Sequence, residues 1–300
     1  MRSFGFARSL IELVKCRRDG GDLALSDANG DEYVTSGLLT CGTCGARYRL
    51  DGGVIDTNRE LQDLIEPMLQ EREARDREAE EYDAYTEQPW YRLEVPSTMA
   101  ELSDIDGKLV AEFGSGTGRF TTELIRAGGT VVAIDFSGAS HRVLQKKLTG
   151  PSPLGLIRED VAHVRLKPGS FDVAVSAQLL QHIPTDEARQ AFFKNAWSCL
   201  KPGGCFLLTA YFQEMRRRLR HLPQEGVHDS GIFFHHFTRE ELQRDLSPLF
   251  DIQILEPFLY HVPWIWRLDN VFPWISTLSG KTPLLREFGS LIMFKGTKKD

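Results

Sequence analysis

A glycine-rich turn after an apolar run constrains this 300-residue chain more than any other feature. Residues 109–118 read Leu-Val-Ala-Glu-Phe-Gly-Ser-Gly-Thr-Gly, an apolar run followed by three glycines at alternate positions. Glycine tolerates positive φ and lets a ligand approach the backbone closely, so the pattern predicts a buried strand and a tight turn. A helix is predicted to follow, from about Arg119 to the pair Gly128-Gly129.

A second apolar run, Val131–Ile134, ends in Asp135 and places a carboxylate beside the glycine turn. The carboxyl edge of an open α/β sheet is where such folds bind nucleotides. Dinucleotide-binding turns follow Gly-x-Gly-x-x-Gly, but here the third glycine comes one residue early and Arg119 occupies its usual place. Glu112, two residues before the first glycine, would repel phosphate. The site is therefore predicted to hold a cationic ligand without phosphate.

From this point the chain resembles the class I S-adenosylmethionine-dependent methyltransferases over roughly residues 80–300. Later segments match the family in order: 156–161 and 171–176 as the third and fourth strands, then 200–204 and 205–211 as a turn and the fifth strand. The resemblance implies an α/β, Rossmann-like fold with a seven-stranded sheet. The sixth and seventh strands are expected near Phe250–Leu259 and Gly289–Gly296.

The resemblance also implies a set of cofactor-binding residues. Glu112 would organise the amino-acid end of S-adenosylmethionine, Asp135 would accept hydrogen bonds from both ribose hydroxyls, and Asp160 would contact adenine. An N-terminal helix often covers the cofactor in related enzymes, so one of Tyr82, Tyr85 and Trp90 could touch it, the alternative being packing against the core. The implied set is Glu112, Gly114, Ser115, Gly116, Gly118, Asp135, Phe136, Asp160, Val161, Gln178 and Tyr82.

Methyl transfer depends mainly on alignment of the nucleophile with the methyl group, so a general base is optional. His182, Tyr211 and His236 are the candidate catalytic residues. The structural alternatives are that His182 only hydrogen-bonds neighbouring backbone and that the pair His235-His236 is structural. After the fourth strand the chain reads Ser-Ala-Gln-Leu at 176–179. Relatives that methylate nucleic-acid bases or protein glutamine commonly have Asn/Asp-Pro-Pro-aromatic there, so this segment speaks against that substrate class.

The first 58 residues have short strands and turns and carry three of the five cysteines. Cys41-x-x-Cys44 beside glycines is half of a zinc knuckle, and Cys16-Arg-Arg-Asp19 would be the other half, with aspartate in place of a cysteine. The segment is similar to the small zinc-ribbon-like domains of the methyltransferase-activator type. A structural zinc on Cys16, Asp19, Cys41 and Cys44 is one interpretation, and a metal-free relic is the other.

We expect three regions: a zinc-ribbon-like module over 1–58, a helical connector and cofactor cap over 59–100, and a methyltransferase domain over 101–300. Residues 71–83 carry three arginines and seven acids, which indicates a solvated helix. Lid insertions are expected near 212–236, with a basic cluster at 216–221, and near 260–288, with Trp264, Trp266, Phe272 and Trp274. The aromatic insertion could instead form a homo-oligomer contact, local core or a peripheral membrane contact.

The composition of the chain favours some classes of function over others. With 41% hydrophobic and 26% charged residues the chain is typical of a soluble globular protein, and the net charge of −6 speaks against a large nucleic-acid surface. Scattered cysteines, an N-terminus interrupted by Arg8 and Glu12, and the lack of a membrane span favour the cytoplasm. We expect methyl transfer to a small or medium-sized, partly apolar acceptor at oxygen, with carbon or nitrogen open. The alternatives are an RNA base methyltransferase and a non-catalytic cofactor-binding partner subunit.

Overall fold

The computed structural model describes residues 4–57, 65–82, 89–102, 104–148, 152–260 and 286–300. Its strands are β1 (Phe6–Ala7), β2 (Leu23–Asn29), β3 (Tyr33–Val34), β4 (Ser36–Cys41), β5 (Arg47–Asp51), β6 (Val54–Asp56), β7 (Leu109–Phe113), β8 (Thr130–Asp135), β9 (Leu154–Arg158), β10 (Phe171–Ala177), β11 (Leu200–Tyr211), β12 (Glu225–Val227), β13 (Phe233–His235), β14 (Phe250–Tyr260) and β15 (Gly289–Lys298). Its helices are η1 (Arg8–Leu13), α1 (Glu66–Glu78), α3 (Pro89–Glu101), α4 (Arg119–Arg126), α5 (Gly138–Lys147), η2 (Leu180–His182), α6 (Asp186–Cys199), α7 (Met215–Leu219) and α8 (Arg239–Leu246).

The main sheet follows the order β14-β15-β11-β10-β7-β8-β9-β6-β5-β4-β2. Its first seven strands are those that the sequence predicts, including the antiparallel pair formed by β14 and β15, and the α/β fold class is confirmed. Strands β9, β8, β7, β10 and β11 run parallel, so their carboxyl ends meet at one edge. This edge brings Glu112, Asp135 and Asp160 into one region of the molecule.

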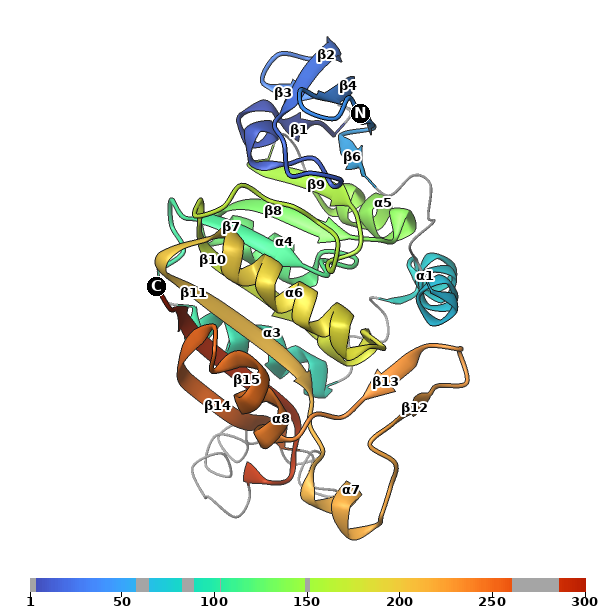
Figure 1. Cartoon of the computed structure of the whole chain (residues 1–300). Coiled ribbons are helices and arrows are strands. Elements are labelled where there is room, and N and C mark those ends of the chain that lie inside the picture. The colour runs from blue at the N-terminus through green and yellow to red at the C-terminus, as the bar shows by residue number, and fades with distance from the viewer. Residues whose placement is uncertain (1–3, 58–64, 83–88, 103, 149–151, 261–285) are drawn as a thin grey trace.

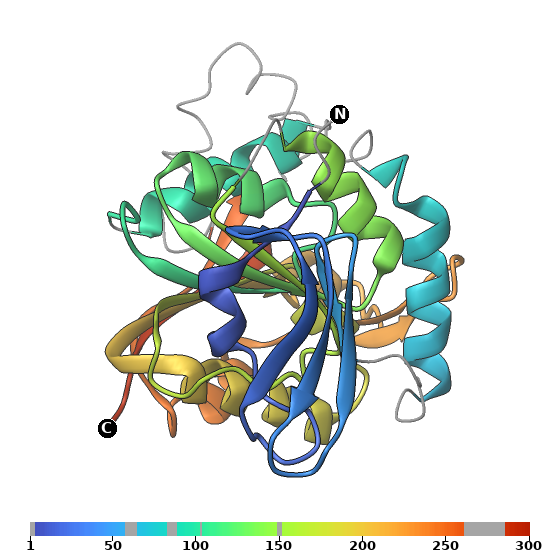
Figure 2. The same ribbon diagram turned by 90° about the horizontal axis from the view of Figure 1, so that it is seen from above.

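Helices cover both faces of the sheet. Helices α3, α4 and α5 lie on one face, and α6 and α8 lie on the other (Figures 1 and 2). The α6 side holds the larger core, in which Phe192 packs against Phe113, Phe193 and Phe206. The α4–α5 side holds a second core of mainly aliphatic residues around Leu124 and Leu144. The predicted helix after the glycine turn is α4, and it ends before Gly128 as expected.

The N-terminal β module continues the main sheet instead of standing beside it. Strand β6 pairs in parallel with β9, with Val54 opposite Leu156 and Asp56 opposite Arg158. Phe6 packs on Gly155 of β9, where an added Cβ atom would come within 2.5 Å of the ring. The sequence predicts a module of its own, but does not predict this continuous sheet. The expected division into three regions stays a prediction.

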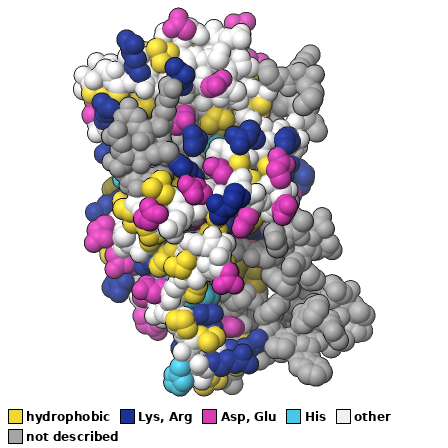
Figure 3. Space-filling model, turned by 90° about the vertical axis from the view of Figure 1, so that its right-hand side faces the viewer, with side chains coloured by type: hydrophobic (Ala, Val, Ile, Leu, Met, Phe, Trp, Pro, Cys, Tyr) yellow, Lys and Arg dark blue, Asp and Glu magenta, His cyan; other side chains and the backbone are white. Residues whose placement is uncertain are grey.

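The segment between β11 and α8 projects from the lower end of the molecule as α7 and the hairpin of β12 and β13 (Figure 1). On the face shown in Figure 3, charged side chains of both signs are interspersed, and basic, apolar and histidine side chains gather at the lower end. The second expected insertion, 260–288, lies almost wholly outside the described residues, and so do Trp264, Trp266, Phe272 and Trp274. Among the residues that the structure describes, no helix is long and apolar enough to cross a membrane.

Candidate active site

The turn between β7 and α4 has the geometry that its glycines predict. Gly114 and Gly116 adopt φ values of +76° and +51°, and a Cβ atom on Gly116 would meet nothing within 4 Å. Gly116 therefore leaves open space beside the backbone, as a ligand-binding turn requires. Gly118 has a different role, because its Cβ atom would come within 2.1 Å of Leu144 on α5. It permits close packing of α5 and does not line the cavity.

Asp135 ends β8 with its carboxylate held by two backbone donors. The Gly116 N–H donates to Oδ2 and the Ser137 N–H donates to Oδ1, each at 2.8 Å. Burial raises the pKa of this carboxyl despite the two bonds. Next to it, the buried hydroxyl oxygen of Ser115 has no hydrogen-bond partner among the residues that the structure describes. A buried hydroxyl without a partner is costly, so it is well placed to bond a ligand.

Glu112 is a buried carboxyl at the end of β7. The hydroxyl of Thr121 on α4 donates to its Oε2 at 2.6 Å, and burial raises the pKa of Glu112 to about 8. Burying a carboxylate without a cationic partner is unfavourable, and a cationic ligand would relieve that cost. The side chain therefore favours a positively charged group in the cavity.

Helix α1 covers the cavity with residues that the sequence analysis did not identify. Glu71 is 5% exposed, ion-paired to Arg75 at 3.5 Å, and both line the cavity with Tyr82. Burial raises the pKa of Glu71 to about 8. Asp76 fixes the helix in place, because its Oδ1 accepts a hydrogen bond from the Ser137 hydroxyl at 2.7 Å. The prediction of a solvated helix is therefore wrong for this face, since alternating charge alone does not reveal which pair is buried.

Glu94 on α3 is another residue near the cavity that no sequence pattern indicated. Its side chain is fully buried and pairs with Arg119 at 2.9 Å, while the Gln178 amide also donates to it. Gln178 holds an unusual backbone φ of +51° and lines the cavity. The Glu94 carboxylate thus holds two residues that line the cavity, Arg119 of α4 and Gln178, which follows β10.

Two adjoining cavities, of about 70 and 30 Å³, occupy the carboxyl edge. The first is lined by most of the predicted cofactor residues, and the second lies on the β9 side. Glu112, Ser115, Gly116, Gln178 and Tyr82 line the first, Asp160 and Val161 line the second, and Gly114, Asp135, Phe136 and His182 line both. Tyr85 and the Trp90 side chain lie outside the described residues.

The three candidate catalytic residues form one aromatic group, of which only His182 reaches the cavities. The Tyr211 ring lies 5.8 Å from the His182 ring and stacks on the His236 ring at 5.1 Å. His182 Nδ1 lies 2.8 Å from the carbonyl oxygen of Phe233, which requires a proton on Nδ1. Burial lowers the pKa of His182 well below its usual value and that of His236 to about 4. Both imidazoles are therefore neutral near pH 7.

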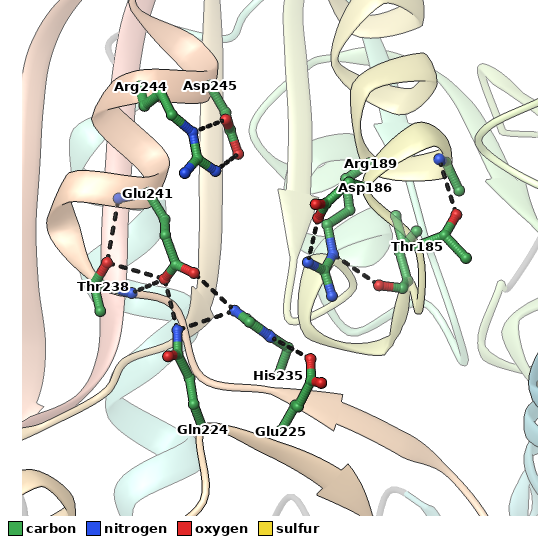
Figure 4. Close-up of polar contacts among 12 residues, drawn as sticks. Thr185, Asp186, Arg189, Gln224, Glu225, His235, Thr238, Glu241, Arg244 and Asp245 are labelled. Carbon is green, nitrogen blue, oxygen red and sulfur yellow. Dashed lines mark hydrogen bonds and ion pairs between the residues drawn. The ribbon is translucent and has the colours of Figure 1, made fainter.

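His235, by contrast, belongs to a structural network. Its ring lies between Glu225, 3.2 Å from Nδ1, and Glu241, 3.3 Å from Nε2 (Figure 4). Glu241 also completes a capping box at the start of α8, in which the Thr238 hydroxyl accepts from the Glu241 N–H. The contacts of Glu241 thus tie the β12–β13 hairpin to α8.

The N-terminal module brings its four expected ligands together. One ligand atom from each of Cys16, Asp19, Cys41 and Cys44 lies within 4.8 Å of the others. The N–H groups of Thr43 and Cys44 point at the Cys41 sulfur, at 3.4 and 3.5 Å. The hydrogen bond from the Cys44 N–H lowers the pKa of Cys41, and this favours the thiolate that a metal needs. The arrangement could hold a metal ion.

Comparison with known proteins decides the chemistry at the carboxyl edge. A family described as "Methyltransferase domain" matches residues 111–208, which include the glycine turn. An uncharacterised methyltransferase of Geobacillus kaustophilus is 28% identical over 72% of this chain and 95% of its own length. The protein is an S-adenosylmethionine-dependent methyltransferase. A crystal structure of an S-adenosylmethionine-dependent methyltransferase from Mesorhizobium loti shares the methyltransferase fold, with a TM-score of 0.52, 19% identity, and coverage of 67% of this chain and 96% of that one.

Another structural neighbour covers more of the methyltransferase. Burkholderia thailandensis 1,6-didemethyltoxoflavin-N1-methyltransferase, solved with its acceptor and S-adenosylhomocysteine, has a TM-score of 0.56 at 15% identity, over 88% of this chain and 96% of that one. The residues of the present chain fit a sulfonium cofactor, because several buried acids and the partnerless Ser115 hydroxyl surround the cavity.

Proposed function

We propose that this methyltransferase acts on a small or medium-sized, partly apolar molecule and methylates an oxygen atom. The observation that carries the proposal is the uncharged group of His182, Tyr211 and His236 beside the cavity. Neutral aromatic side chains favour an apolar ring and disfavour a charged acceptor. Small-molecule acceptors also occur among the similar proteins, as their names state.

The cofactor supplies an electrophilic methyl group on a sulfonium. On the protein side, we propose that Asp135 accepts hydrogen bonds from the ribose hydroxyls while its two backbone donors keep the carboxylate oriented. Glu112 and Glu71, which both line the larger of these two cavities, would balance the positive charge of the cofactor. Asp160, at the end of β9, would contact adenine in the smaller cavity.

His182 is proposed to position the acceptor hydroxyl. Because Nδ1 carries the proton toward the Phe233 carbonyl, the lone pair is on Nε2. The Gln181 side-chain nitrogen lies 3.3 Å from Nε2 and donates to it, and the acceptor hydroxyl would take the place of this donor. The contact from Nδ1 to Phe233 links the active site to β13 of the projecting hairpin. Alignment at contact distance can supply about 7–11 kcal/mol of barrier lowering, so a neutral imidazole that orients the hydroxyl is sufficient without a strong base.

An acceptor screen tests the proposal. Purified protein and methyl-labelled cofactor are incubated with matched phenols, anilines, primary amines and total RNA, and the methylated atom is identified by NMR. Transfer to phenols or other hydroxyl compounds supports the proposal. Transfer to nitrogen alone would contradict the oxygen assignment, and some similar proteins are N-methyltransferases by name, including phosphoethanolamine N-methyltransferase 1 of Triticum aestivum at 34% identity over 37% of this chain and 23% of its own length. Transfer to RNA alone would contradict the small-molecule class.

We also propose that the N-terminal cluster holds a structural zinc ion. Three sulfur ligands and one carboxylate within reach of one point match the donor number and type that tetrahedral zinc prefers. The Tyr48 hydroxyl, 3.1 Å from the Cys16 sulfur, adds an outer hydrogen bond of the kind that orients metal ligands. The zinc would join the turn at 16–19 to the turn at 41–44.

A further inference from the structure

A third hollow, on the other side of the loop after β9, has a strongly basic lining. It has a volume of about 250 Å³ and lies between the N-terminal module, that loop and α6. Four basic residues from all three regions line it: Arg17 from the module, His163 and Arg165 from the loop, and Lys194 from α6. Its remaining lining is Ala162, Ala191 and Asn195, so that none of the described lining residues carries a carboxylate. We call this hollow the basic pocket.

The nearby acids neutralise only part of the positive charge of the basic pocket. Glu159 lies 2.8 Å from the Arg17 Nε and Asp160 lies 2.9 Å from the His163 Nδ1, so two of the four basic side chains face acids buried behind the wall. The Arg165 Nε donates instead to the backbone carbonyl of Arg17, which carries no charge. Arg165 and Lys194 thus add positive charge that neither acid balances, in a chain whose net charge is −6.

The wall of the basic pocket is fixed by backbone contacts. The Asn195 side chain donates to the carbonyls of Val161 and Ala162 at 2.9 and 3.1 Å, which joins α6 to the loop. The Lys15 N–H donates to the Arg165 carbonyl at 2.9 Å, which joins the module to the same loop. The hydrogen bond to Asp160 raises the pKa of His163 and so favours its charged form. The backbone that carries these side chains is therefore held in place before any ligand arrives.

We propose that the basic pocket binds a phosphate group. Guanidinium, ammonium and imidazolium donors that converge on one hollow match the several acceptor oxygens and the charge of phosphate, and the arginines can bond it in a bidentate way. The phosphate comes from one of two sources, a free phosphorylated small molecule or the backbone of a nucleic acid. The site is separate from the proposed methyl-transfer cavity and does not depend on it.

The basic pocket shares a wall with the cofactor side of the molecule. Glu159 and Asp160 line the smaller cavity at the carboxyl edge, and each is paired with a basic residue that lines the basic pocket. A phosphate that draws Arg17 and His163 toward itself weakens both ion pairs. Phosphate and S-adenosylhomocysteine should therefore alter each other's affinity by the same factor. This second effect rests on the proposed cofactor site, whereas phosphate binding itself does not.

Two probes test the proposal on the full chain at low ionic strength in a phosphate-free buffer. Inorganic phosphate is titrated by calorimetry, and a labelled six-nucleotide single-stranded RNA is titrated by fluorescence anisotropy. The variant Arg165→Ala with Lys194→Ala removes two pocket charges that contact no proposed cofactor residue. The control Arg47→Ala with Arg49→Ala removes the same charge from the exposed side of β5. Circular dichroism checks that both variants fold.

We expect at least one probe to bind, with roughly tenfold or greater weakening in the pocket variant and no more than about twofold in the control. Phosphate binding without RNA binding identifies a small phosphorylated ligand. RNA binding that inorganic phosphate displaces identifies a nucleic acid. Failure of both probes, or equal losses in the two variants, overturns the proposal. If the double variant does not fold, Lys194→Gln is measured alone against Arg49→Gln by the same criterion.

Discussion

The carboxylate of Asp135 occupies the point where β8, the glycine turn and the start of α5 meet. Each of its oxygens accepts one backbone N–H, and each retains capacity for a ribose hydroxyl. We predict that Asp135→Ala weakens S-adenosylhomocysteine binding at least tenfold in calorimetry, about 1.4 kcal/mol or more. Asp31→Ala, which removes an exposed carboxylate from the N-terminal module, is the matched control. Unchanged affinity in Asp135→Ala would contradict the proposed ribose contact.

The pKa values of Glu71 and Glu112 lead to a prediction about pH. Burial raises both to about 8, so in the ligand-free protein both are largely protonated at pH 6 and ionised at pH 9. A cationic cofactor binds the ionised form better, and binding below pH 8 therefore releases protons. Affinity should rise with pH by up to about tenfold per unit for each proton released, and level off above pH 8 to 9. Calorimetry in buffers of different ionisation enthalpy measures the released protons.

The variant Glu71→Gln separates the contribution of Glu71 to this pH dependence from that of Glu112. The amide keeps the shape of the side chain but cannot ionise, so the variant should release fewer protons on binding and show a shallower pH dependence. Glu73→Gln changes an exposed glutamate of the same helix and is the control. It should behave as the native protein. An equal pH dependence in all three proteins would exclude Glu71 as a counter-charge for the cofactor.

At the residue scale, the sequence predicts the side chains that lie at the carboxyl ends of strands. Glu112 and Asp135 are found in the sequence because a parallel sheet brings its carboxyl ends to one edge. Glu71, Arg75 and Glu94 are not found, because they come from α1 and α3, whose placement depends on tertiary contacts. One such contact is the bond between Asp76 and Ser137, and no local pattern in the sequence indicates it.

At the scale of elements, the N-terminus of α8 combines a cap with a hairpin anchor. Thr238 accepts from the Glu241 N–H, and Glu241 contacts His235 and Gln224 of the neighbouring hairpin segment (Figure 4). We predict that Thr238→Ala lowers the free energy of unfolding by about 1 kcal/mol, the usual loss for an N-cap, with a midpoint shift in urea titration. Thr238→Ser keeps the hydroxyl and should restore most of this stability. A loss in Thr238→Ser equal to that in Thr238→Ala would assign the effect to packing of the methyl group.

The turns at 16–19 and 41–44 lead to a prediction about metal. We expect about one zinc per chain in protein purified without added metal, and loss of zinc when Cys41→Ser is combined with Cys44→Ser. Cys205→Ser, a cysteine outside the cluster, should retain the metal. Metal-free native protein, reduced and never exposed to chelator, would favour the relic interpretation. The spacing of these four residues in the sequence indicates a metal site, and the fold brings their ligand atoms close together.

At the scale of the whole molecule, strand order is predictable where strands follow one another through short helices. The seven strands β7 to β11, β14 and β15 follow the family order that the motifs indicate. The addition of β6, β5, β4 and β2 to the same sheet could not be predicted, because β6, with three residues, is too short to indicate a partner. Its pairing with β9 depends on the packing of Phe6 against Gly155, two residues about 150 positions apart.

The continuous sheet predicts that the module and the remainder unfold together. Phe6 is fully buried between them, so Phe6→Ala should lower the free energy of unfolding by about 3–5 kcal/mol. All five tryptophans lie beyond residue 58, so their fluorescence reports on the rest of the chain and not on the module. A lower denaturant midpoint by tryptophan fluorescence in Phe6→Ala would show the coupling, and an unchanged midpoint would show two independent units. Leu219→Ala, at a 70% exposed position, is the control.

The pairing of β6 with β9 also has a consequence for synthesis on the ribosome. Val54 emerges about a hundred residues before its partner Leu156, which at 5–20 residues per second is a delay of roughly 5–20 s. During that time the module exposes an unpaired strand edge and the face that later covers Phe6. The turns that carry Cys16 and Cys44 are only 28 positions apart, so a metal ion could join them while β9 is still untranslated. Early metal capture would then hold the nascent module in order until the parallel strand arrives.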